Sequence, residues 1–142
     1  MFRKKLLHPY ILINLIFIIL ILSIFLYSLL FSAEKSNYPV HSNYTTLTNN
    51  TSISTGLSRS FSEIVRLNFA KAKEYNRYGL QIFIFFLSQL ILRIVSTGIL
   101  LFSSRLNKIS IITDIILSSA LFIVLFRPYI IELAGIFVRS MR

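Results

Sequence analysis

Residues 10–31 read YILINLIFIILILSIFLYSLLF, a run of 22 residues without a charged side chain. An α-helix rises about 1.5 Å per residue, so this run would reach roughly 33 Å, enough to cross a bilayer. A basic start before an apolar run is also how a signal peptide begins, but this run exceeds the usual apolar region of such peptides. We therefore predict that residues 1–31 form a basic N-terminal segment and a first transmembrane helix.

Two further apolar runs, residues 78–102 and 109–126, are joined by the short polar connection SSRLNK. They predict a transmembrane helical hairpin over residues 78–126. The composition agrees, because 55% of the 142 residues are hydrophobic. A soluble domain of this size could not bury that much apolar surface.

The end of the third run is interrupted by Arg127 and Pro128. Proline has no amide hydrogen to donate and disfavours helix for the residue before it. Either the helix continues with a kink, or it ends and a short interfacial helix follows over residues 127–142. We favour the second interpretation, because Arg127 and Tyr129 suit a membrane–water interface.

The segment between the first two runs has two parts. Residues 32–58 are rich in Ser, Thr and Asn and predict a polar loop. Residues 59–77 have helical spacing of apolar residues, and Ser60 with Glu63 fits a capping box. This pattern predicts a basic amphipathic helix in the interface, or alternatively a solvated extension of the second span. The predicted fold is thus an all-α integral membrane protein with three transmembrane helices.

The chain is strongly basic, with 15 Lys and Arg against 5 Asp and Glu and a formal charge of +10. These charges flank apolar runs instead of forming a folded basic face, so we expect membrane lipids as partners and not nucleic acid. Five of the 14 flanking cations lie on the N-terminal side of the membrane and nine on the other, which favours an outside N-terminus. The candidate interfacial lipid contacts are Arg66, Lys71, Lys73, Arg77 and Arg127.

Arg93 lies inside the second apolar run, where a charge costs about 2.5–3.5 kcal/mol on insertion scales. Counted from the turn of the hairpin, Arg93 and Asp114 differ in height by only ~6 Å, which a long Arg side chain can span. We therefore hypothesise an intramembrane ion pair between them. The alternatives are that Arg93 reaches a lipid headgroup while Asp114 sits at the interface, or that Arg93 meets an acidic group of another subunit.

The remaining polar residues give little sign of chemistry. The chain has no Cys, and its two histidines, His8 and His41, fall at an interface and in a loop. We therefore expect no haem, no other cofactor, no metal and no enzymatic activity. For Glu132 the simplest interpretation is an interfacial salt bridge or a headgroup contact.

These features predict a non-catalytic accessory subunit of a larger membrane complex, with other integral membrane subunits as partners. The Ile-rich, Ala-poor composition suggests an AT-rich genome. That points to an organellar inner membrane, such as the mitochondrial one, or to a bacterial inner membrane. A respiratory or photosynthetic complex would be a suitable host. The alternative is a small self-assembling pore or holin-like protein, in which Gln89, Arg93 and Thr97 would face a wet lumen.

Overall fold

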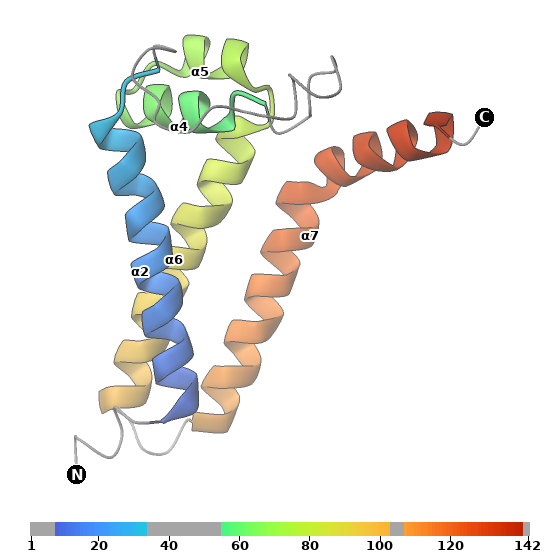
Figure 1. The fold of residues 1–142 in the computed structure, drawn as a ribbon. Coiled ribbons are helices and arrows are strands. Elements are labelled where there is room, and N and C mark those ends of the chain that lie inside the picture. Colours follow the sequence, from blue (N-terminus) through green and yellow to red (C-terminus); the bar gives the residue numbers. More distant parts are fainter. Residues whose placement is uncertain (1–7, 34–54, 103–106, 141–142) are drawn as a thin grey trace. The chain divides into compact units, whose positions relative to one another are not determined.

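A computed structural model describes residues 8–33, 55–102 and 107–140 (Figure 1). Every regular element in these three stretches is an α-helix. The helices are α2 (Pro9–Leu30), α4 (Leu57–Val65), α5 (Phe69–Tyr75), α6 (Gly79–Phe102) and α7 (Asn107–Ser140). Most of the expected polar loop, residues 34–54, lies outside the described residues.

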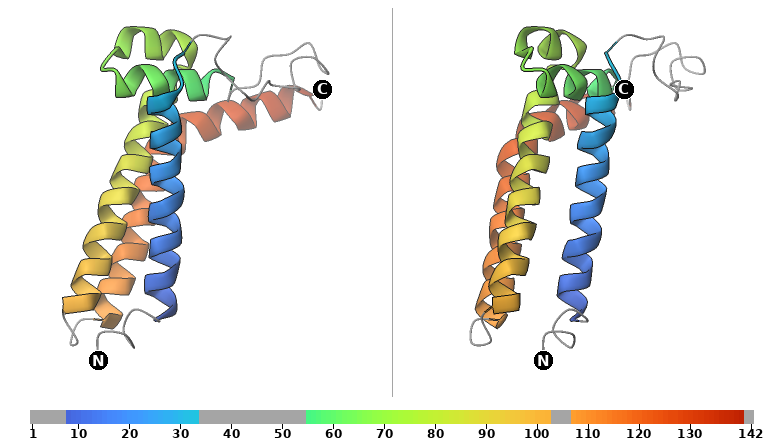
Figure 2. Two further views of the ribbon diagram at one scale, coloured as in Figure 1. Left: turned by 60° about the vertical axis from the view of Figure 1, so that its left-hand side comes forward. Right: turned by 90° about the vertical axis from the view of Figure 1, so that its left-hand side faces the viewer.

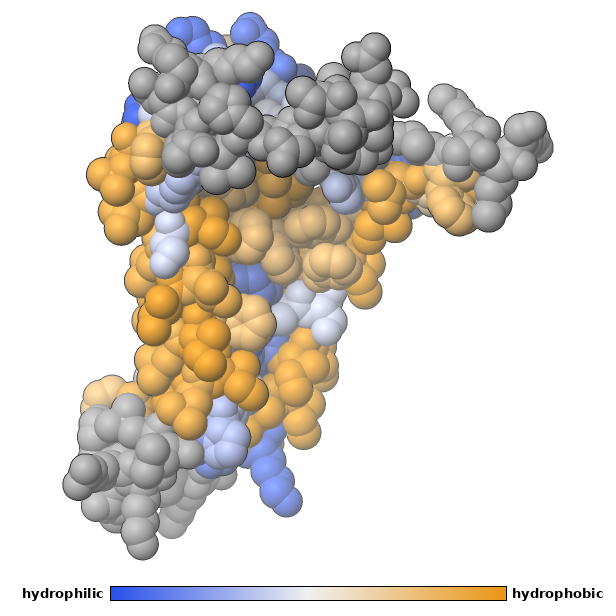
Figure 3. Space-filling view, in the orientation of Figure 1, coloured by the Kyte–Doolittle hydropathy of each residue, from blue (hydrophilic) through white to orange (hydrophobic). Residues whose placement is uncertain are grey.

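Among the described residues, three helical stretches are long and apolar enough to cross a bilayer: Pro9–Leu30, Gly79–Phe102 and Lys108–Gly135. Only a small part of the Lys108–Gly135 stretch is buried within the chain. Hydrophobic residues cover most of the helix surfaces that face the viewer in Figure 3, and hydrophilic residues are visible along the upper edge, at α5. Such surfaces are costly in water and suited to lipid, so the prediction of a helical membrane protein agrees with the structure.

The chain divides into two compact units. The first comprises Met1–Ser23 and Ile84–Leu125, and the second comprises Ile24–Phe83 and Phe126–Arg142. Parts of α2, α6 and α7 build the first unit. The second contains α4 and α5 with the remaining parts of the three long helices.

The C-terminal region differs from the prediction. Helix α7 runs from Asn107 to Ser140 with Pro128 inside it, so the expected separate helix over residues 127–142 is wrong. A proline removes one amide donor and leaves one carbonyl of the preceding turn without its usual partner. An apolar solvent favours continuous helix all the same, because a full break would free many more backbone groups.

The expected single amphipathic helix over residues 59–77 is also wrong, because the structure has two short helices there (Figure 2). Helix α4 starts at Leu57 after an N-cap glycine, Gly56, and not at a Ser60 cap. Ser60 is fully buried inside the helix, so the proposed capping box with Glu63 does not form. Most of residues 59–77 are helical as predicted, but the break between Val65 and Phe69 was not predicted.

That break is a Schellman motif built around Leu67, which has a φ of +62°. The Asn68 amide donates to the Glu63 carbonyl at 2.9 Å, and the Leu67 amide donates to the Ile64 carbonyl at 2.9 Å. Glycine usually takes this left-handed position, since it costs another residue about 1–2 kcal/mol. A leucine occupies the position that is usually a glycine, so the sequence contains no signal for this turn. Sequence analysis therefore did not predict it.

Two glycines of the second unit stand where a side chain does not fit. Gly56 has a φ of +80°, and a Cβ there would lie 2.3 Å from the Tyr75 carbonyl oxygen. A Cβ on Gly79 would lie 1.9 Å from Ser60 Oγ. These contacts bring the start of α4 close to the end of α5 and to the start of α6.

We predict that Gly56→Ala and Gly79→Ala each destabilise the second unit by about 1–3 kcal/mol, because the added methyl group overpacks both sites and strains the backbone at Gly56. Gly98→Ala and Gly135→Ala are matched controls, since a Cβ at either position meets nothing within 4 Å. Thermal unfolding in a mild detergent measures the difference. Equal melting temperatures for all four variants would contradict the close approach.

Candidate functional site

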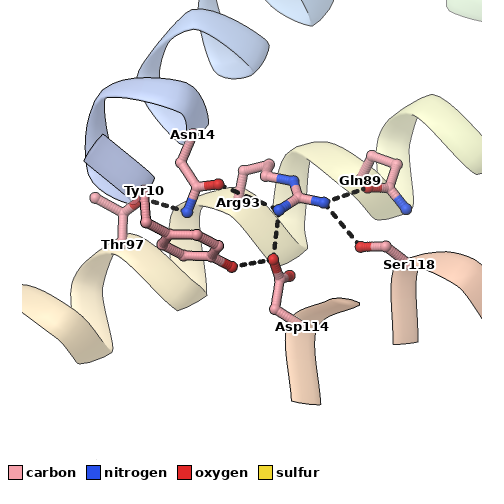
Figure 4. A network of polar contacts seen from close by, with 7 residues as sticks. All are labelled: Tyr10, Asn14, Gln89, Arg93, Thr97, Asp114 and Ser118. Atoms are coloured by element: carbon pink, nitrogen blue, oxygen red, sulfur yellow. Dashed lines mark hydrogen bonds and ion pairs between the residues drawn. The ribbon is translucent and has the colours of Figure 1, made fainter. Parts of the chain in front are cut away.

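Seven polar side chains from three helices meet in the first unit, and we name them the Arg93 cluster (Figure 4). Each helix contributes residues spaced by four, which places them on one side of that helix. The members are Tyr10 and Asn14 on α2, Gln89, Arg93 and Thr97 on α6, and Asp114 and Ser118 on α7. The cluster therefore joins all three helices of this unit.

At its centre, Arg93 forms an ion pair with Asp114. The exposed fraction of the side chain is 14% for Arg93 and 1% for Asp114. Two charges withdrawn from water in this way are tolerated only when they pair with each other and find further hydrogen bonds. The Arg93 guanidinium also lies 5.7 Å from the centre of the Phe17 ring, a cation–π contact.

The two terminal nitrogens of Arg93 are fully used. Nη1 donates to Asp114 and, at 3.1 Å, to Asn14 Oδ1. Nη2 donates to Gln89 Oε1 at 3.1 Å and to Ser118 Oγ at 2.8 Å. Since each Nη carries two hydrogens, four acceptors match four donors. All four Nη donors of the Arg93 guanidinium are therefore bonded to side chains of the same chain.

The α2 residues complete the cluster from the other side. The Tyr10 hydroxyl donates to Asp114, on the same carboxylate oxygen that Arg93 contacts. Asn14 is fully buried, and its Nδ2 donates to Thr97 Oγ1 at 3.4 Å. Asn14 therefore accepts from Arg93 and donates to Thr97, which fixes the orientation of its amide. Two buried atoms, Gln89 Nε2 and Asp114 Oδ1, have no hydrogen-bond partner among the described residues.

The structure brings together Arg93 and Asp114, the two residues singled out from the sequence as a pair. Sequence analysis missed the roles of Tyr10, Asn14 and Ser118. Each is a polar residue in an apolar run, and their four-residue spacing on α2 and α7 was the available signal. Tyr10 stands at the start of the first apolar run, and its hydroxyl contacts Asp114.

Of the five expected lipid contacts, Arg66 has a different use in the second unit. Its Nη2 donates to the Leu29 carbonyl at 3.1 Å, and its Nη1 donates to the carbonyls of Ser62 at 2.7 Å and Ser28 at 3.4 Å. One turn earlier, Ser62 Oγ donates to the Phe31 carbonyl at 2.5 Å. The last carbonyls of a helix lack intrahelical partners and carry partial negative charge, so α4 caps the C-terminal end of α2.

Arg77 likewise has a partner, because it forms an ion pair with Glu132 of α7. The Tyr78 hydroxyl donates to the same carboxylate, and the Tyr78 and Tyr129 rings meet edge to face at 5.6 Å. The hydrogen bond to Tyr78, followed by the attraction of Glu132, raises the pKa of Arg77. This agrees with the salt-bridge interpretation of Glu132. Lys71, Lys73 and Arg127 are exposed.

The described residues contain no group of three or more His, Cys, Asp or Glu that could hold a metal ion. Comparison with known proteins finds no matching family model, no similar curated protein and no similar solved structure.

We predict that Arg93→Gln and Asp114→Asn each lower the free energy of unfolding by about 3–5 kcal/mol, because each leaves a buried charge unpaired. The double variant should lose no more than either single variant, since it removes the pair as a whole. Unfolding in a mild detergent measures all three, with Lys108→Gln as a control at an exposed site. Losses that simply add would show that the two residues are not coupled.

We also predict that Arg66→Gln destabilises the second unit by about 1 kcal/mol, because the last carbonyls of α2 lose a charged donor. Lys71→Gln removes the same charge from an exposed site on α5 and should leave stability unchanged. Melting temperatures of the two variants, compared in one detergent, give the result. A drop of equal size in both would mean that net charge matters and capping does not.

Proposed function

We propose that this protein is a non-catalytic, structural subunit of a larger membrane assembly. The observation that carries the proposal is the saturation of Arg93, whose four Nη donors are all taken by side chains of the same chain. A catalytic or pore-lining arginine needs donors free for a substrate or for water. A guanidinium bonded on every Nη hydrogen serves to hold helices together.

The outer surface of α7 supports a partner in the membrane. Apolar side chains on one side of this helix are exposed, among them Ile112, Ile116 and Ile123, which recur at helical spacing. Ser119 is exposed on the same side and is small enough to let a neighbouring helix approach. Lipid alone would also solvate this surface, so the test has to separate lipid from protein.

The test is to purify the tagged chain from its native membrane in a mild detergent and to determine its mass by native mass spectrometry. We expect one assembly with the same integral membrane proteins in fixed ratio. Ser119→Phe should release the chain from that assembly, because a bulky ring blocks a close helix contact and is tolerated by lipid. Ser23→Phe, at an exposed serine of α2, is the control and should leave the assembly intact.

The competing function, a self-assembling pore, predicts other results. The purified chain would then form an oligomer of itself and conduct ions in reconstituted bilayers. Conductance that persists in the wild-type chain, with no other subunit in the preparation, would overturn the proposal.

A further inference from the structure

The turn between α4 and α5 carries an unexpected residue. Residues 66–69, here named the Leu67 turn, place a leucine in the left-handed position that closes the Schellman motif. Glycine would adopt this conformation without strain. A strained backbone that survives at an exposed site is a reason to ask what its side chain does.

The Leu67 turn is also the most exposed apolar part of the two short helices. The exposed fraction is 76% for Leu67 and 51% for Phe69. The apolar residues Phe61, Ile64 and Ala72 of the same two helices are buried, so the second unit has a core from which Leu67 and Phe69 are excluded. Within the second unit, these two side chains face away from that core.

The position of the turn follows from its neighbour Arg66. The Arg66 guanidinium donates to the carbonyls of Ser28 and Leu29, in the last turn of a helix that is long and apolar enough to span a membrane. Leu67 follows Arg66 directly, so it lies beside the end of that helix. Where α2 crosses a bilayer, its end coincides with the headgroup layer.

The charge of this segment is complementary to an anionic surface. Residues 55–78 contain five Lys or Arg and two Glu, a net charge of +3. Lys73 follows Phe69 by one helical turn, so the two share a side of α5. A lysine in this position can lay its methylene chain along the apolar boundary while its ammonium group meets phosphate.

From these observations we infer that the Leu67 turn is a membrane-surface anchor that binds anionic phospholipid. Leu67 and Phe69 insert below the headgroups, and Lys73 contacts their phosphates. The anchor pins the two short helices to the bilayer at the end of α2. It depends on the chain spanning a membrane but not on whether the chain is a subunit or a pore.

The chain has no Trp, so a single Phe69→Trp substitution gives a specific reporter of depth. The full-length variant is placed in nanodiscs of phosphatidylcholine with or without phosphatidylglycerol, and brominated acyl chains quench a tryptophan that reaches them. We expect at least twofold quenching with phosphatidylglycerol present. A reporter at Glu74, an exposed residue on another side of α5, should not be quenched.

Leu67→Gly, added to the Phe69→Trp reporter, separates anchoring from folding. Glycine relieves the strained backbone, so this variant should melt no lower than its parent and yet lose at least half of the quenching. Leu67→Met restores an apolar side chain and should restore the quenching. An unchanged signal in Leu67→Gly, or no quenching at Phe69→Trp in either lipid, would overturn the inference.

The two lysines of α5 allow the contact with the headgroup to be tested, with Lys73 as the test site and Lys71 as the control. Lys73→Gln should abolish the dependence of quenching on phosphatidylglycerol. Lys71→Gln, which removes the same charge from the other side of the helix, should retain at least half of it. If the two substitutions reduced this dependence equally, the contact between Lys73 and phosphate would be wrong. The lysines would then act only by a general attraction to anionic lipid.

Discussion

The buried ion pair between Arg93 and Asp114 is the constraint on which the first unit depends. A charge removed from water must be matched by an opposite charge and by hydrogen bonds, and neither is available from acyl chains. Residues of α2, α6 and α7 satisfy this demand together, since no single helix offers enough partners. The cost of leaving Arg93 unpaired therefore favours an arrangement in which these three helices meet.

The second unit meets a related demand at the end of a helix. The carbonyls at the end of a helix lack amide partners. Arg66, the C-cap residue of α4, donates to the Ser28 and Leu29 carbonyls of α2, and Ser62 of α4 donates to the carbonyl of Phe31, which follows α2. Close approaches at Gly56 and Gly79 then hold the two short helices against the start of α6. Both units thus use polar contacts to fix helices whose apolar surfaces alone would not specify a neighbour.

The different locations of the polar contacts and the apolar surfaces are relevant to function. Within the Arg93 cluster, all four Nη donors of Arg93 are taken by side chains of the same chain, whereas many apolar side chains are exposed, most clearly on α7. A molecule of this kind offers surfaces to lipid and to other helices, which is the basis of the proposed structural role. The Leu67 turn differs from these surfaces, because there an exposed apolar side chain sits on a left-handed backbone in a segment with exposed lysines.

The sequence by itself determined the three long apolar helices, because length and hydropathy are properties of each segment alone. It also marked Arg93 and Asp114 as residues that need partners. Only the tertiary structure decided which partners they have, since Tyr10, Asn14 and Ser118 reach the pair through the rotation and height of separate helices. The break at Leu67 and the continuity of α7 through Pro128 were likewise decided by backbone hydrogen bonding, which outweighs the preference of one residue.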